Sequence, residues 1–286
     1  MTNSSLLEKF QKATFSHAYI FSSILSENKD ITKEIIELFN PSIKIKEIKQ
    51  ISAEKMLQET FLNKYIRMDI LIELDDGTLV NIEMQNDNKD NIPKRLRYYS
   101  SIITTNSLPK GKHYTFLPSV LIMMICSFDL FNHNKPIYTF TMNTSDKDNP
   151  THLEDELKIQ VINVSGHLDN LSVDQKAFLK YIKDGVVSTP LTRKIDAKIK
   201  KLKEKEYGRI GFMKYELDMQ DSYYSGLSVG EKKGIEKERK INIISFFKTL
   251  INLDFNYDDA VKTIANSRDI PETEIRKIIE SSNKVA

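Results

Sequence analysis

Residues 67–85 constrain the fold more than any other stretch, because their pattern predicts two strands joined by a tight turn. The turn signal is Asp75-Asp76-Gly77, a combination that favours chain reversal. Apolar residues alternate with polar or mixed ones on either side of it, and alternation with a period of two is typical of half-buried strands. The alternating apolar positions are Ile70, Ile72 and Leu74 before the turn, and Val80, Ile82 and Met84 after it.

The length of the turn decides which side chains of the two strands meet. A two-residue loop would mix apolar and polar positions on each face of the hairpin. A three-residue loop, with Gly77 in the left-handed conformation of a bulge, pairs Leu74 with Thr78 and keeps one face continuously apolar. That register also places Met68 opposite Met84 on the apolar face. We therefore expect the three-residue loop.

The same register brings two acids together on the polar face. Asp69 lies opposite Glu83, and Arg67 lies opposite Gln85. Directly opposed side chains have Cβ atoms about 5 Å apart, so two carboxylates at these positions repel each other. A hard divalent cation with oxygen ligands would remove the repulsion. The alternative is an ordinary solvated hairpin face, which the spacing alone leaves open.

Composition narrows the class of protein without indicating a function. The 286 residues suffice for one large domain and a small appendage, and a net charge of +2 gives no argument for nucleic acid. The single cysteine, Cys126, excludes an internal disulfide framework, and its apolar neighbours predict an inert core residue. No secretory signal is visible, and the longest apolar run, residues 120–126, is far shorter than the roughly 20 residues of a membrane span. We therefore expect a cytoplasmic protein.

The remaining pattern predicts a sheet with helices before and after it, which is an α/β arrangement. Pro93 fits the first turn of a helix that ends before Pro109. Further helices are expected over residues 6–39, in two pieces, and over residues 171–182. Further strands are expected over residues 43–48, 117–128, 137–142 and 157–164.

Three cations occupy the first turn of the helix that begins at Pro93. They are Lys94, Arg95 and Arg97. Cations at a helix N-terminus oppose the helix dipole and slightly destabilise the helix, so a functional role would explain their presence. Because helix N-termini bind phosphate, these side chains could contact a phosphate backbone. A solvated basic face explains them equally well.

The chain changes character after Thr189-Pro190, which marks a break. We divide it into a large domain over residues 1–187, a charged helical connector over residues 188–240 and a small helical module over residues 241–286. The basic stretch at residues 193–205 could touch nucleic acid. A solvated amphipathic helix is the better interpretation of that stretch, because apolar residues recur within it at helical spacing.

Three glycines spaced by charged residues, Gly226, Gly230 and Gly234, predict a flexible connector. Beyond them, two short helices in succession could form a helix-turn-helix for DNA, but they lack a basic recognition face. A packing or oligomerisation module is at least as good an interpretation. The helical segments expected in this region are residues 241–253, 257–265 and 271–281.

Several motifs together resemble a known family. Asp69 followed by Glu83-Met84-Gln85 is similar to the core of the PD-(D/E)XK nuclease superfamily, with glutamine in place of the usual lysine. In particular, the chain resembles the Rpn family of recombination-promoting nucleases and transposases over about residues 15–240. The matching motifs lie at Tyr65–Asp69, Asn81–Gln85, Pro93–Tyr99, Gly111–Tyr114 and Cys126–Phe131, with similarity also over residues 226–240.

This resemblance implies a restriction-endonuclease-like fold, a central mixed sheet flanked by helices, with a helical C-terminal extension. It also implies Mg²⁺-dependent DNA cleavage, with Mn²⁺ or Ca²⁺ as alternatives in vitro, linked to recombination or mobile elements. Asp69 and Glu83 would be metal ligands, and Gln85 would orient water or a phosphate oxygen by hydrogen bonding, because an amide carries no charge. Such enzymes commonly act as homodimers. The DNA-binding candidates are Lys94, Arg95 and Arg97.

One position departs from the pattern of the family. Members often carry an acid in the N-terminal helix, where this chain has Ala18. Glu27 is a candidate substitute for that acid, and His17 beside Ala18 is interpreted as structural. The missing acid and Gln85 motivate a rival hypothesis, a catalytically decayed nucleic-acid-binding protein. A third hypothesis is an interaction protein whose acid pair is a solvated face.

Overall fold

The computed structural model describes residues 3–57, 66–88 and 90–283 of the chain. It divides into two compact units, Met1–Tyr215 and Glu216–Ala286. The boundary lies within one long helix, α7 (Glu206–Asn252). None of the described helices is long and apolar enough to cross a membrane.

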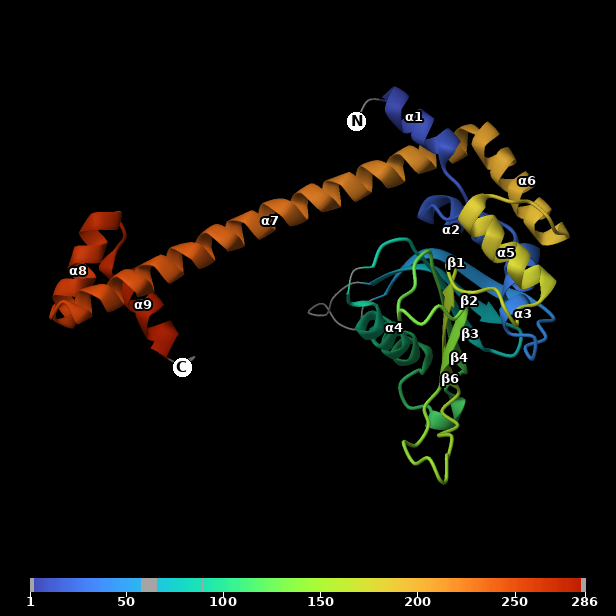
Figure 1. Cartoon of the computed structure of the whole chain (residues 1–286), viewed down its shortest axis with the longest axis horizontal. Helices are drawn as coiled ribbons and strands as arrows, with labels where there is room; N and C mark the ends of the chain where they lie inside the picture. The colour runs from blue at the N-terminus through green and yellow to red at the C-terminus, as the bar shows by residue number, and fades with distance from the viewer. Residues whose placement is uncertain (1–2, 58–65, 89, 284–286) are drawn as a thin grey trace. The chain divides into compact units, whose positions relative to one another are not determined.

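Within the described residues, a six-stranded mixed sheet forms the centre of the first unit (Figure 1). Its order is β1-β2-β3-β4-β6-β5, with an antiparallel meander of β1, β2 and β3 followed by parallel β3, β4 and β6. Parallel neighbours need a crossover, and α4 (Ile92–Ser107) supplies it between β3 and β4. The strands are β1 (Ile48–Leu57), β2 (Ile66–Leu74), β3 (Leu79–Gln85), β4 (Val120–Cys126), β5 (Ile137–Phe140) and β6 (Leu157–Asn163).

Helices cover both faces of the sheet, which confirms the predicted α/β fold with a central mixed sheet (Figure 1). On one face α4 packs over Met124 and Val161, with Leu96 and Ile103 of the helix in contact with the strands. The opposite face carries the larger core. The helices over that core are α1 (Asn3–Lys12), α2 (Ala18–Glu27), α3 (Lys29–Phe39), α5 (Val173–Asp184) and α6 (Pro190–Glu204).

The hairpin of β2 and β3 has the predicted three-residue loop. The backbone N–H of Leu74 donates to the carbonyl of Thr78 at 2.9 Å, and Gly77 has a φ of +90°, where a side chain would be strained. Ile70 lies opposite Ile82, as the register requires. The local pattern therefore predicted the pairing of these strands correctly up to Ile70.

Beyond Ile70 the expected apolar face does not continue. Met84 packs in the larger core, whereas Met68 packs in the cluster under α4, so the prediction that these two methionines face each other is wrong. The reason is that the N–H of Met84 donates to the carboxylate of Asp69 at 2.9 Å, and the backbone pairing of the two strands ends at Ile70–Ile82. The expected contact of Arg67 with Gln85 lies outside the described side chains.

Some predicted boundaries need correction. Residues 43–48 were expected to form a strand, but the strand starts at Ile48. The preceding N–H groups bond to side chains instead: Ile45 to Glu37 at 2.9 Å, and Lys46 to Asp75 at 3.2 Å. The N-terminal helical region forms three helices where two pieces were expected, while the helix at Pro93 and the last three strands are confirmed.

The glycines of the predicted flexible connector lie inside α7, which continues through Gly226, Gly230 and Gly234. A glycine costs about 1 kcal/mol in a helix, and the strong helix formers around these three keep the helix continuous. In the second unit, the end of α7 packs with α8 (Tyr257–Arg268) and α9 (Glu272–Asn283). The two short helices predicted near the C-terminus are therefore confirmed.

Candidate metal centre and nucleic-acid interface

Asp69 and Glu83 meet where β2 and β3 separate. The backbone N–H of Asp69 donates to Oε1 of Glu83 at 3.0 Å, and the N–H of Met84 donates to Oδ2 of Asp69 at 2.9 Å. Each carboxylate thus accepts a hydrogen bond from the opposite strand. Glu83 is 4% exposed, so the pair is not an ordinary solvated hairpin face.

Asn81 supports Glu83 from the same strand. Its Nδ2 donates to Oε1 of Glu83 at 2.9 Å and to the carbonyl of Ile70 at 3.0 Å, and its side chain is fully buried. Asn81 is a residue of the site that was not predicted from the sequence. Its signal was the alternation of Asn81, Glu83 and Gln85, which puts three polar side chains on one face of a strand.

Burial raises the pKa of Glu83 to about 8, and the negative charge of Asp69 adds to this shift. Hydrogen bonds from Asn81 and from the Asp69 backbone, together with the charge of Arg95, act in the opposite direction. Near neutral pH the carboxyl group of Glu83 therefore tends to hold a proton.

Arg95 reaches the site from the first turn of α4. Its Nη2 donates to Oε1 of Gln85, and its guanidinium lies 5.6 Å from the ring centre of Tyr99. The other end of the Gln85 amide donates to the carbonyl of Asp87 at 2.7 Å. Gln85 therefore holds Arg95 in place, an interaction that the strand pattern alone did not predict.

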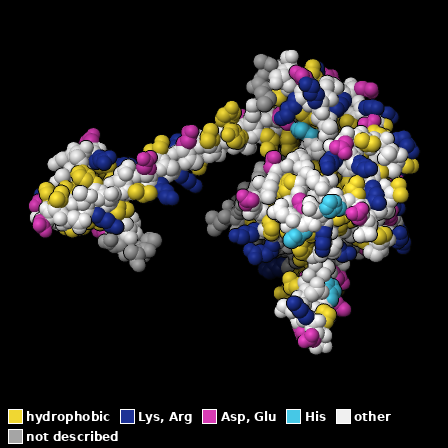
Figure 2. Space-filling view, in the orientation of Figure 1, with side chains coloured by type: hydrophobic (Ala, Val, Ile, Leu, Met, Phe, Trp, Pro, Cys, Tyr) yellow, Lys and Arg dark blue, Asp and Glu magenta, His cyan; other side chains and the backbone are white. Residues whose placement is uncertain are grey.

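The other two predicted cations lie further out. Lys94 and Arg97 are exposed on α4. Figure 2 shows Lys and Arg side chains gathered over the position of this helix. The structure therefore separates the three cations into Arg95, which contacts the site, and two exposed neighbours.

The start of α2 lies beside the end of β3, because Nδ2 of Asn86 donates to the carbonyl of Ser16 at 2.8 Å. Ala18 follows two residues later and supplies no carboxylate. Glu27 lies at the other end of α2, about 14 Å along the helix, and accepts a hydrogen bond from Tyr207. Glu27 is therefore not placed to substitute for the missing acid. His17 packs on Phe212, with ring centres 4.7 Å apart, as a structural residue would.

Cys126 and Asp129, two further residues of the matching motifs, have structural roles. Cys126 is fully buried, and burial raises the pKa of its thiol to about 12, as expected of an inert core residue. Asp129 accepts hydrogen bonds from the N–H groups of Phe131 and Asn134 and from the hydroxyl of Tyr138. It organises its own loop.

The donor set fits a divalent cation that keeps some of its water. Among the described residues, no group of three Asp, Glu, His or Cys side chains is arranged to hold a metal ion. The carboxyl groups of Asp69 and Glu83 are nevertheless two hard oxygen donors held close together, and a divalent cation would replace the proton that Glu83 tends to hold. Mg²⁺ commonly uses only one or two protein carboxylates, with water or substrate phosphate as its other ligands.

A mixed sheet flanked by helices, with paired carboxylates on a hairpin beside a basic helix, defines an α/β nuclease-like fold. The sequence pattern of the PD-(D/E)XK nuclease family transposases matches residues 14–183, and the chain belongs to this family. This membership confirms the resemblance noted from the motifs and supports a nuclease or transposase-like function. PD-(D/E)XK nucleases generally use divalent metal ions. Comparisons with curated proteins and with solved structures give no match.

Proposed function

We propose that the chain is a divalent-metal-dependent DNA endonuclease, with Mg²⁺ as its ion, linked to recombination or mobile elements. The observation that carries this proposal is the pairing of partly buried Asp69 with buried Glu83, whose carboxylates each accept a hydrogen bond from the opposite strand. Ionising the buried Glu83 beside Asp69 is costly without a cation. Membership of a nuclease family of transposases supports DNA as the substrate.

Each residue of the site has a distinct proposed role. Asp69 and Glu83 hold the cation, and Asn81 fixes the carboxylate of Glu83 through Oε1. A bound divalent cation polarises the scissile phosphate and lowers the pKa of its water. Gln85 positions Arg95, whose guanidinium neutralises the phosphate at the site. The exposed cations Lys94 and Arg97 contact phosphates on either side of it.

A plasmid-nicking assay tests the proposal. Supercoiled DNA is incubated with the protein and Mg²⁺, Mn²⁺ or Ca²⁺, with EDTA as the blank. We expect nicking that requires a divalent ion and that Asp69→Asn and Glu83→Gln each abolish. The matched control is Asp76→Asn, which changes an exposed acid in the turn of the same hairpin and should nick at the wild-type rate.

A decayed DNA-binding protein is the second candidate, favoured by Ala18 at the position of an acid in the family and by Gln85 in place of lysine. It predicts no nicking with any ion but retained DNA binding. That binding should weaken as salt rises and should depend on the cations of α4. Nicking that survives both acid substitutions would contradict the metal-centre proposal.

Endonucleases that cut both strands often act as pairs, so we also propose a homodimer. The proposed oligomerisation module is the helical second unit, which packs around a core of Val261, Ile264 and Ile275. Sedimentation of the full chain tests it, and a monomer at micromolar concentration, with and without DNA, would contradict it.

A further inference from the structure

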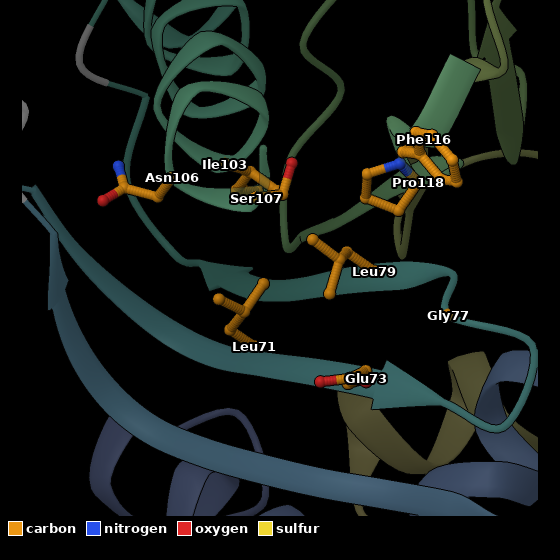
Figure 3. Close-up of a pocket in the computed structure, with 9 residues that line it drawn as sticks. All are labelled: Leu71, Glu73, Gly77, Leu79, Ile103, Asn106, Ser107, Phe116 and Pro118. Carbon is orange, nitrogen blue, oxygen red and sulfur yellow. The ribbon is translucent and has the colours of Figure 1, made fainter. Parts of the chain in front are cut away.

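A hollow of about 370 Å³ lies beneath the C-terminal end of α4, on the hairpin of β2 and β3. Figure 3 shows Leu71 and Leu79 on its strand side, the end of α4 across from them, and Phe116 and Pro118 at one side. We call this hollow the hairpin pocket. Its polar lining comes from Glu73, Asn106 and Ser107.

The hairpin pocket and the acid pair share one face of the sheet. On β2, Leu71 follows Asp69 by two residues and packs in the cluster under α4. On β3, Leu79 precedes Glu83 by four residues, so these two side chains project to the same side of the sheet. The separations along the strands are about 7 and 13 Å. The helix α4 spans both places, with Arg95 at the acid pair and Asn106 at the pocket. A strand of DNA at the acid pair could therefore also reach the pocket.

The rim of the pocket combines aromatic and basic side chains. Phe116 is 68% exposed, and the ammonium of Lys112 lies 5.8 Å from its ring centre. Lys110 and Tyr114 are exposed on the same loop. Aromatic rings beside cations are typical of sites that stack the bases of single-stranded DNA and bind its phosphates.

The interior of the pocket favours hydrogen-bond donors over phosphate. Glu73 contributes a carboxylate, and the last turn of α4 presents the negative end of the helix dipole. The ammonium of Lys49 lies 3.7 Å from the Glu73 carboxylate, and both side chains are nearly half exposed, so water or a ligand can replace that contact. The amino group of a base suits such an interior better than an anion does.

We infer that the hairpin pocket binds an unstacked base of single-stranded DNA, with Phe116 as the stacking ring. Glu73 accepts a hydrogen bond from the amino group of the base, and Lys110 and Lys112 contact its flanking phosphates. Carbonyl-rich thymine lacks this amino group, so cytosine is preferred over thymine. This inference rests on the proposed function, since it assumes a DNA substrate.

Fluorescence anisotropy with labelled oligonucleotides in EDTA tests the inference in the full-length protein without cleavage. We expect Phe116→Ala to weaken binding of single-stranded oligodeoxycytidine about tenfold, because the variant loses one base–aromatic stack. Binding of a fully paired duplex should not change, and Phe116→Trp should restore the affinity. Glu73→Gln should reduce the preference for oligodeoxycytidine over oligothymidine. The matched control, Phe140→Ala, removes an exposed ring from β5 at the other edge of the sheet.

The outcomes separate this inference from the proposed function. If wild-type protein nicks plasmid but Phe116→Ala binds single strands as well as wild type does, the base site is wrong and the nuclease stands. An equal loss on single strands and duplex also overturns the base site, because it indicates general damage. If the wild-type protein neither nicks plasmid nor binds any DNA, both proposals fail.

Discussion

Asp69 and Glu83 each accept a hydrogen bond from the strand of the other. The backbone N–H of Asp69 donates to the carboxylate of Glu83, and the backbone N–H of Met84 donates to the carboxylate of Asp69. These two hydrogen bonds occur where the backbone pairing of the hairpin stops. The acids therefore end the strand pairing and form the candidate metal centre at the same point. A change at either acid should affect both stability and metal binding.

The stability of the metal-free protein should fall as pH rises from about 4.5 to about 8. Burial raises the pKa of Glu83 from 4.5 to about 8 in the folded protein, so the folded state retains a proton that the unfolded chain releases. The contribution is fully present below about pH 4.5 and is lost above about pH 8. Thermal unfolding in EDTA at several pH values measures it. Glu83→Gln should flatten this part of the profile, and an unchanged profile would contradict the assignment.

Arg95→Ala should move the pH at which the protein binds metal upward. The charge of Arg95 lowers the pKa of Glu83, and a metal ion binds the deprotonated carboxylate. Titration of Mn²⁺ followed by electron paramagnetic resonance measures the midpoint. Arg95→Lys should move it less, and Arg97→Ala, which removes an exposed cation of the same helix, should leave it in place.

Ala18→Asp should strengthen metal binding. Ala18 opens α2, whose start is tied to the end of β3 by the hydrogen bond between Asn86 and Ser16. An acid here adds an oxygen donor and also suits the N-terminus of a helix, so the fold should tolerate it. The same Mn²⁺ titration measures the gain, with Ala18→Asn as the neutral control. Equal affinity of both variants and wild type would place Ala18 outside the metal centre.

Asn81→Leu should destabilise the protein by about 1–3 kcal/mol, because it removes donors from the buried Glu83 carboxylate and from the carbonyl of Ile70. Urea unfolding at neutral pH measures the loss. If the contact with Glu83 accounts for part of it, the effects of Asn81→Leu and Glu83→Gln should not add in the double variant. Strict additivity would show that Asn81 acts independently of Glu83.

Substitution of alanine should have opposite effects at two kinds of glycine. At Gly230 in α7 a Cβ would meet nothing within 4 Å, so Gly230→Ala should stabilise the helix by about 1 kcal/mol. Gly77 also has open space, but its φ of +90° strains any side chain, so Gly77→Ala should destabilise the first unit. Circular dichroism melting curves of the two variants measure both. Destabilisation at Gly230 would contradict the continuous helix.

The sequence predicted what local rules decide. Period-two alternation and the positive φ of Gly77 defined the hairpin register as far as Ile70. Met68 was placed wrongly, because its packing depends on how the Asp69 carboxylate interrupts the strand pairing, which alternation does not encode. The glycines of α7 were misread since local helix cost was treated as decisive, although the surrounding residues outweigh it.

The sequence predicted only the part of the candidate site that depends on strand register. Asp69 and Glu83 could be paired by register, but the contact of Arg95 with Gln85 depends on where α4 crosses the sheet. The buried support from Asn81 depends on the closure of the core under that helix. These features are tertiary, and a single sequence contains only the residue types that permit them.

A crystal structure with Mn²⁺ tests the central claim most directly, because the anomalous signal of manganese locates the ion independently of any activity. The account predicts one strong peak contacted by carboxylate oxygens of both Asp69 and Glu83, absent from crystals of Glu83→Gln. A protein that nicks plasmid with Mn²⁺ while its manganese lies away from these two residues would contradict the account.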